Sequence, residues 1–361
     1  MKKFGVITQA VIAVTIVIAT AYWFFLPGGV SKKEPDGKSG NVQKLSGEVV
    51  ERISSGDVFL TYWHSDQFVR FSELTSPHFD NTKFAVVLIH GLFESAADEW
   101  LANMATQIAK VEPDTEILAV DWAKFALKGK KNLSWATVTG DVISAYTSVG
   151  NDDDVTKLGW WKNLAGELAS KKSTKQMLEI ADVVKSIPLV ADAAAEYLFG
   201  ETGLKLQPDV THIIGFSHGA HVGGLIGKKT DGTLRRLTLL DPSTRLVHFG
   251  NINAFGTGWD SQSAKFTDMY QTSYWAGSGK AYGHKTFKVV MPGTEKSRLP
   301  PGPAEDARRH SFAPKWFAST VGSQHQDYGY SMTIPDNGPF QEGGWTGTIT
   351  GTLSENPNGV E

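Results

Sequence analysis

Cysteine is absent from this sequence, and neither sign of charge dominates it. Lys and Arg number 35 and Asp and Glu 38 among 361 residues. Without cysteine, the chain has no disulfide, no thiolate metal ligand and no cysteine nucleophile. The balanced charge lacks the basic excess with which nucleic-acid-binding proteins contact phosphates, so we expect no nucleic-acid partner. The length suits one large α/β domain or two ordinary ones.

The N-terminus holds a long apolar segment. Lys2 and Lys3 precede a nearly uncharged stretch over residues 4–26, and about 20 apolar residues are enough to cross a bilayer. Four aromatic residues at 22–25 are typical of a membrane interface, whereas the small residues before them are compatible with signal-peptide cleavage. We expect residues 1–27 to be a transmembrane anchor or, as the alternative, a cleaved signal segment. In both cases the rest of the chain is exported, and it is secreted if the segment is cleaved.

Composition divides the remainder of the chain into three parts. Residues 28–47 are rich in Gly, Ser, Lys and Pro and lack apolar periodicity, which predicts a flexible linker. We expect a folded domain over residues 48–345, with an insertion at about 123–176. A polar C-terminal tail is expected over residues 346–361.

Apolar runs typical of strands alternate with helical patterns along this domain. The helical patterns cover residues 95–111, 177–199 and 220–229, and the second is interrupted near Pro188. Strands are predicted at residues 58–63, 68–71, 84–89, 117–120, 210–216, 236–240, 266–271 and 287–291. The alternation predicts an α/β fold with a mostly parallel central sheet flanked by helices.

A Gly-x-Ser-x-Gly motif centred on Ser217 joins the predicted strand at 210–216 to the helix that follows. This is the sequence form of a nucleophile elbow, in which the serine lies on a strained strand-to-helix turn. Glycines flank the serine because larger side chains would collide with the neighbouring strand and helix. The alternative is a glycine-rich turn with a capping serine. The first interpretation makes Ser217 the nucleophile of a serine hydrolase.

A serine nucleophile needs a general base and an acid that orients the base. Asp241 directly follows the strand at 236–240, at the strand end where ligands bind in α/β sheets. The competing acids are Asp260, Asp268 and Asp306. His310, in a loop-like stretch after a proline-rich segment, is favoured as the base over His248, His284 and His325. His212 and His221 are interpreted as structural.

An acyl-transfer enzyme also needs hydrogen-bond donors for a developing oxyanion. One donor is the backbone N–H after the nucleophile, here that of His218. The second is expected from the loop after the strand at 84–89, where a His-Gly pair lets the backbone approach the substrate. We assign this second donor to the N–H of Leu92. Neither side chain is needed for the role.

Several of these motifs occur together in one order. They are Ile89-His90-Gly91, Val120-Asp121-Trp122, Ile214 through Gly224, Leu239 through Ser243, Gly283-His284 and Arg309-His310. In this order, and in the 24 positions from Ser217 to Asp241, the chain resembles the pancreatic lipase family of α/β-hydrolases. The resemblance implies an α/β-hydrolase fold and a triad of Ser217, Asp241 and His310 as nucleophile, acid and base. It also implies an oxyanion hole formed by the N–H groups of Leu92 and His218.

The chain also departs from the family's pattern. His218 stands where the family usually has leucine. The insertion at 123–176 makes the sequence distance between Asp121 and Ser217 longer than in the family. A lid is expected over residues 291–310, and it is short, polar and without disulfides, which in the family goes with phospholipid cleavage. The family's calcium site would lie near Asp260–Ser263, but Ser263 stands where an acid is expected. We therefore expect no metal and no cofactor.

These interpretations predict a membrane-tethered carboxylic-ester hydrolase that acts on lipid esters, of the lipase or phospholipase type, through an acyl-enzyme. Its partners would be a lipid or ester substrate and, through the N-terminal segment, the membrane. Two other functions are compatible with the same motifs. A non-catalytic, surface-anchored lipid-binding protein can use the same scaffold, and an acyltransferase can use the same triad with an acceptor other than water.

Overall fold

The computed structural model describes most of the predicted domain. It describes residues 47–74, 79–126, 171–243, 258–274, 281–294, 301–323, 327–334, 339–342 and 344–351. The predicted anchor, nearly all of the linker and most of the insertion lie outside these ranges, as do the middle of the expected lid and the end of the tail. Among the helices that are described, none is both long enough and apolar enough to cross a membrane.

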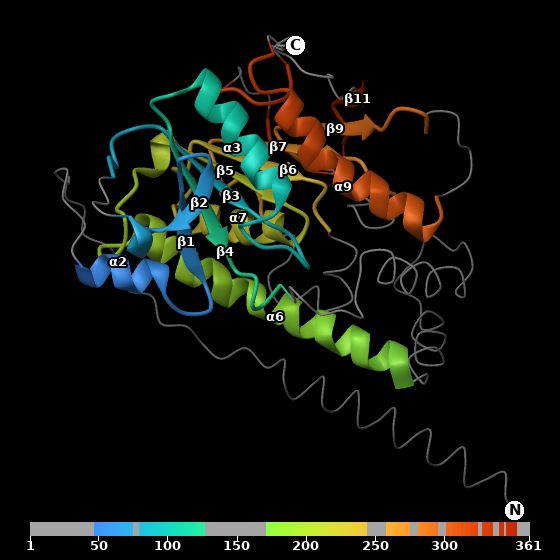
Figure 1. The fold of residues 1–361 in the computed structure, drawn as a ribbon. Helices are drawn as coiled ribbons and strands as arrows, with labels where there is room; N and C mark the ends of the chain where they lie inside the picture. The colour runs from blue at the N-terminus through green and yellow to red at the C-terminus, as the bar shows by residue number, and fades with distance from the viewer. Residues whose placement is uncertain are drawn as a thin grey trace, which may run out of the picture.

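A nine-stranded sheet runs through the centre of the fold (Figure 1). Its strands follow the order β11-β9-β7-β6-β5-β3-β4-β1-β2. β1 pairs antiparallel with β2 and β4, and the other neighbours pair in parallel, so the mostly parallel sheet predicted from the sequence is confirmed. The strands are β1 (Phe59–His64), β2 (Gln67–Arg70), β3 (Ala85–Ile89), β4 (Glu116–Asp121), β5 (Thr211–Phe216), β6 (Arg236–Leu240), β7 (Phe266–Gln271), β9 (Lys285–Val290) and β11 (Gly347–Thr350). A separate antiparallel pair consists of β8 (Tyr282–Gly283) and β10 (Gln341–Glu342).

Helices cover both faces of the main sheet (Figure 1). On one side α3 (Glu99–Val111) packs against α9 (Pro303–Ser319). On the other side α6 (Lys171–Phe199) packs against α7 (His218–Lys228), and α2 (Gly47–Ser54) joins the same core. The shorter 3-10 helices are η1 (Phe71–Glu73) and η2 (Pro208–Val210).

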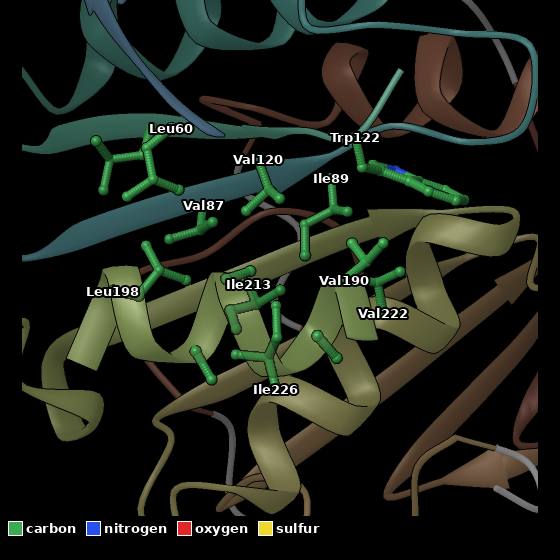
Figure 2. Packing of buried hydrophobic residues seen from close by; sticks show 14 of the residues in the cluster. Leu60, Val87, Ile89, Val120, Trp122, Val190, Leu198, Ile213, Val222 and Ile226 are labelled. Carbon is green, nitrogen blue, oxygen red and sulfur yellow. The ribbon is translucent and has the colours of Figure 1, made fainter. Parts of the chain in front are cut away.

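Strand β3, at the centre of the sheet, is apolar along its whole length, as suits a strand covered on both faces. In β3, Val87 and Ile89 pack in the core formed with α6 and α7, while Val86 and Leu88 pack in the core formed with α3 and α9. Successive strand residues alternate between faces, so a strand buried on both sides needs a continuous apolar run. Figure 2 shows the first core, in which side chains of β3 and β5 lie against those of α6 and α7.

The register of the parallel strands brings three strand ends to one edge of the sheet. Ile89 of β3 lies opposite Gly215 of β5, and Phe216 lies opposite Leu240 of β6. The loops after β3, β5 and β6 therefore leave the sheet side by side. In open α/β sheets this edge, beyond the carboxyl ends of the strands, is where ligands bind.

Two elements differ from the sequence prediction, and the predicted tail contributes a strand. α6 runs through Pro188 without the expected interruption; the proline removes one helical hydrogen bond, but the fully buried Ile187 and Val190 hold the helix on the core. His310, predicted in a loop, lies inside α9. Within the predicted tail, residues 347–350 form β11, which pairs in parallel with β9 and so adds an edge strand to the sheet.

Candidate active site

Ser217 occupies a strained turn between β5 and α7. Its backbone has φ 57° and ψ −119°, and such a conformation costs a residue with a side chain about 1–3 kcal/mol. The N–H of Ser217 donates to the carbonyl of Leu240 at 2.9 Å, which ties the turn to β6. The side chain is fully buried and makes no helix-capping hydrogen bond. Among the residues described, none is a hydrogen-bond partner of its Oγ. A strained turn with an unused hydroxyl is typical of a nucleophile elbow rather than of a capping serine.

The glycines of the motif are required by the close approach of backbone atoms. A Cβ on Gly215 would lie 2.5 Å from the carbonyl oxygen of Gly219. A Cβ on Gly219 would lie 2.4 Å from the carbonyl oxygens of both Ile89 and His90. No side chain can move aside to relieve these contacts, because backbone makes them. The sequence expectation that larger residues collide here therefore has a direct structural reason.

Gly219→Ala is expected to lower the free energy of unfolding by at least about 1–3 kcal/mol, the range for overpacked cores. The added methyl would press on the end of β3, so activity should fall as well. Gly223→Ala on the same helix is the control, since its Cβ would meet only side chains, the nearest being Ile213 Cγ2 at 3.0 Å. Urea unfolding of both variants measures the difference, and equal losses would contradict the steric explanation.

Asp241 and His310 form a buried pair at this edge of the sheet. Oδ2 of Asp241 lies 2.5 Å from Nδ1 of His310, and both side chains are fully buried. Oδ1 of Asp241 accepts the N–H groups of Thr272 and Ser273 at 2.9 and 3.2 Å. Because both oxygens are engaged, the carboxylate is fixed in orientation, and it holds a proton on Nδ1 of the imidazole. The opposite ring nitrogen, Nε2, is then the one that can accept a proton.

The ring of His310 also contacts the strand that leads to the motif. Its centroid lies 4.7 Å from that of Phe216, the residue directly before Ser217. The structure therefore brings the predicted base to the acid Asp241 and to the end of β5. His310 reaches this place from α9, a helix that lies far along the chain from β5 and β6 (Figure 1).

The competing acids have other partners. Asp268 is buried and pairs with Arg236 at 2.6 Å, an arrangement that neutralises both charges. Asp306 accepts the N–H of Tyr274 at 2.6 Å, directly after the two residues that donate to Asp241. Asp260 pairs with Lys228 at 2.9 Å. None of these contacts involves a histidine.

The other histidines considered as bases lie elsewhere or outside the described ranges. Nδ1 of His284 accepts a backbone N–H from β7 at 2.9 Å, and burial lowers the pKa of this imidazole. His212 lies at the beginning of β5 and is hydrogen-bonded to Thr238 at 2.8 Å. His248 and His325 fall outside the residues that the structure describes.

The loop after β3 lies directly against the elbow. A Cβ on Gly91 would be 2.9 Å from Cβ of Ser217. The carbonyl of Gly91 is 2.9 Å from Nδ1 of His90, whose Nε2 accepts the N–H of Trp122 at 3.1 Å. Nδ1 therefore carries the proton and donates to that carbonyl. Because a trans peptide points its N–H opposite to its C=O, the N–H of Leu92 faces away from His90.

The other predicted donor, the N–H of His218, lies at the beginning of α7. The first N–H groups of a helix have no carbonyl partner within the helix, and the helix dipole favours negative charge at this end. The geometry around Leu92 and His218 is thus compatible with two donors near the Ser217 turn.

Glu94 is a residue at this site that the sequence analysis missed. Its Oε2 accepts the N–H of Gly91 at 2.8 Å and the indole N–H of Trp100 at 3.2 Å. Burial raises the pKa of the Glu94 carboxyl, although both hydrogen bonds favour its charged form. Glu94 holds the N–H of Gly91 while His90 holds its carbonyl, so the loop is fixed from two sides. No local motif signals this role, because it depends on how the loop turns after β3.

The region expected to correspond to the family's calcium site has a different arrangement. Oγ of Ser263 accepts the N–H of Asp260 at 3.0 Å and so closes a turn. Across the described ranges, no group of three or more His, Asp or Glu side chains is placed to hold a metal ion.

An elbow serine between a parallel strand and a helix, beside an Asp–His pair at the same sheet edge, is the arrangement of an α/β-hydrolase. A family model described as "Lipase" matches residues 171–286. Pancreatic triacylglycerol lipase from Homo sapiens is 24% identical over 244 residues, which cover 63% of this chain and 40% of that protein. Lipoprotein lipase from Sus scrofa is 24% identical over 167 residues, covering 46% of this chain and 25% of that protein. The chain is thus similar in sequence to lipases over part of its length, and it spans less than half the length of these relatives.

Solved structures of esterases are similar to parts of this chain. An esterase from Pyrococcus furiosus has a TM-score of 0.26 and 14% identity, and the match covers 65% of this chain and 71% of that one. An S-formylglutathione hydrolase from Agrobacterium tumefaciens has a TM-score of 0.29 and 12% identity, with 73% and 95% covered.

Proposed function

We propose that this chain is a serine carboxylic-ester hydrolase that acts on lipid esters. The observation that carries the proposal is the strained, buried Ser217 at the same sheet edge as the hydrogen-bonded Asp241–His310 pair. The family matches support it, since both relatives named above are lipases. Triacylglycerols and phospholipids are the proposed substrate classes.

In the proposed reaction, Oγ of Ser217 attacks the ester carbonyl carbon while Nε2 of His310 takes the hydroxyl proton. Asp241 stabilises the imidazolium through its bond to Nδ1. The proton then passes to the leaving alkoxide oxygen, the C–O bond breaks, and the alcohol departs. A water molecule attacks the acyl-enzyme with His310 again as base, which releases the carboxylic acid and restores Ser217.

The negative charge on the carbonyl oxygen is proposed to be stabilised by the N–H groups of Leu92 and His218. Two observations support these donors. The hydrogen bond from His90 holds the Gly91 carbonyl toward His90, so that the Leu92 N–H of the same peptide faces away from His90. His218 lies at the beginning of α7. Removing one such donor typically lowers kcat by about 10²–10³-fold.

Membrane attachment is a separate part of the proposal and rests on residues 1–27 alone. We propose that this segment tethers an exported domain, or is cleaved to release it. The intact mass of the mature protein distinguishes the two, because cleavage removes the mass of the segment.

Labelling with a fluorophosphonate tests the proposed chemistry. The activated serine attacks phosphorus, fluoride leaves, and the adduct stays on Oγ. We expect one adduct per chain, located on Ser217 by peptide mass spectrometry, together with hydrolysis of long-chain acyl esters. A label on another serine, or none, would contradict the proposal. Product analysis with added alcohols separates hydrolysis from acyl transfer.

A further inference from the structure

His218, the residue directly after the proposed nucleophile, has a side chain that the reaction above does not use. It begins α7 and is fully buried. Its Nδ1 lies 2.7 Å from Oγ of Ser243, which is also fully buried. Ser243 follows Asp241 by two positions in the loop after β6. The hydrogen bond thus connects the segment that holds the nucleophile to the segment that holds the acid.

This bond lies beyond the last backbone pairing of the two strands. The ladder between β5 and β6 ends with Phe216 opposite Leu240, and the N–H of Ser217 donates once more to Leu240. After that point the chain turns into α7 on one side and into the loop with Asp241 on the other. The bond between His218 and Ser243 joins the two segments again after they separate.

A role for His218 as a second proton acceptor is disfavoured by its surroundings. Burial first, and then the charges of His221 and His310, hold the pKa of the His218 imidazole well below its usual range. The rings of His218 and His221 are 6.3 Å apart, and that of His221 packs 5.2 Å from Trp259. The ring of His218 is therefore neutral near pH 7, a state suited to a fixed hydrogen bond.

We infer that the His218 side chain is a positioning residue that clamps the loop carrying Asp241 to the elbow carrying Ser217. The clamp fixes the Asp241–His310 pair relative to the Ser217 hydroxyl and holds the first N–H of α7 in place. The inference rests on the proposed function and concerns the same site. It also gives a role to the residue that replaces the family's usual leucine.

The chain contains a matched hydrogen bond away from the site. Nε2 of His212 lies 2.8 Å from Oγ1 of Thr238, and both side chains are fully buried. This bond also joins β5 to β6, but it runs from the beginning of β5 to the middle of β6. His212 lies five positions before Ser217, or about 16 Å along an extended strand. It therefore has the same chemistry and burial without contact with the proposed reacting atoms.

The experiment compares His218→Leu, His218→Asn, Ser243→Ala and the double variant His218→Leu/Ser243→Ala with His212→Leu, all in the full chain. Ester hydrolysis gives kcat and KM, fluorophosphonate labelling gives the rate of attack by Ser217, and thermal unfolding monitors the fold. We expect His218→Leu and Ser243→Ala to lower kcat and the labelling rate together, by about 10- to 100-fold, the scale of a small misplacement of reacting groups. KM should change little.

Three comparisons separate a clamp from a general structural effect. His218→Leu and Ser243→Ala each break the same hydrogen bond, so their effects should not add. The kcat of the double variant should be no lower than that of the slower single variant. His218→Asn should recover most of kcat, because its amide can occupy the place of Nδ1. His212→Leu should lower thermal stability but leave kcat unchanged. Ser243→Ala and His218→Asn carry the test if His218→Leu fails to fold.

The inference alone is overturned if wild-type chain is labelled at Ser217 and Ser243→Ala keeps its full kcat. It is also overturned if the two single changes add, or if His212→Leu lowers kcat equally. Wild-type chain that is neither labelled nor active overturns the proposed function and the inference together.

Discussion

Ser217→Ala is expected to lower kcat for ester hydrolysis by about 10⁴-fold or more, since only binding and the oxyanion donors then remain to accelerate the reaction. KM should change little, because Oγ contributes to bond formation rather than to substrate binding. The free energy of unfolding should change by less than about 1 kcal/mol. The change removes one atom, and that atom has no hydrogen-bond partner among the residues described.

Steady-state kinetics and fluorophosphonate labelling measure this effect, and both signals should disappear together. The matched control is Ser186→Ala on α6, another buried serine, whose Oγ donates to the carbonyl of Val183 at 2.7 Å. Ser186→Ala should leave kcat unchanged. Residual hydrolysis within tenfold of wild type in Ser217→Ala would assign the reaction to another group and contradict the proposed nucleophile.

The central part of the fold could be predicted because its signals are local. Strands buried on both faces have mostly apolar sequences, and β6 and β7 have the bounds that the sequence predicted. Ser217 and Asp241 follow such strands directly. Once the sheet is known to be parallel, their positions after adjacent strands bring them to one edge. Sequence alone therefore predicted that the turn at Ser217 and the loop with Asp241 lie at one edge of the sheet, and their roles as nucleophile and acid stay predictions.

His310 was harder to predict because its position depends on contacts distant in sequence. Asp241 lies 69 positions before it, and no local pattern specifies that bond. The loop predicted at His310 was wrong, because α9 begins before this residue and continues through Pro314, although an interior proline removes a helical hydrogen bond. Pro303 at the beginning of α9 was the signal that could have been used, since proline is favoured in the first helical turn.

The hydrogen bonds that side chains of these loops make could not be predicted from the sequence. Glu94 holds the N–H of Gly91, and Ser243 reaches His218, only because the loops after β3 and β6 turn back over the sheet edge. Such turns depend on the packing around them rather than on residue type. The family pattern draws attention to His218 but says nothing about its partner.

Asp241→Asn is expected to lower kcat by about 10⁴-fold through the tautomer of His310. The two N–H groups that donate to Oδ1 require an oxygen at that position. The amide oxygen of asparagine must therefore face Thr272 and Ser273, and its NH₂ group must face Nδ1 of His310. An NH₂ group cannot accept the Nδ1 proton, so the imidazole holds its proton on Nε2 instead. In that form it cannot accept the proton of Ser217.

Asp306→Asn provides the control for this argument. Asp306 lies one helical turn before His310 and accepts the backbone N–H of Tyr274 through Oδ1, which an amide oxygen can also accept. Its kcat should stay within about threefold of wild type, as for changes that preserve a hydrogen bond. Comparing the two variants distinguishes loss of negative charge from a change of the His310 tautomer. Both variants remove one carboxylate near His310, but only Asp241→Asn is expected to change the tautomer. An equal loss of kcat in both would attribute the effect to charge, whereas a loss confined to Asp241→Asn identifies Asp241 as the group that sets the His310 tautomer.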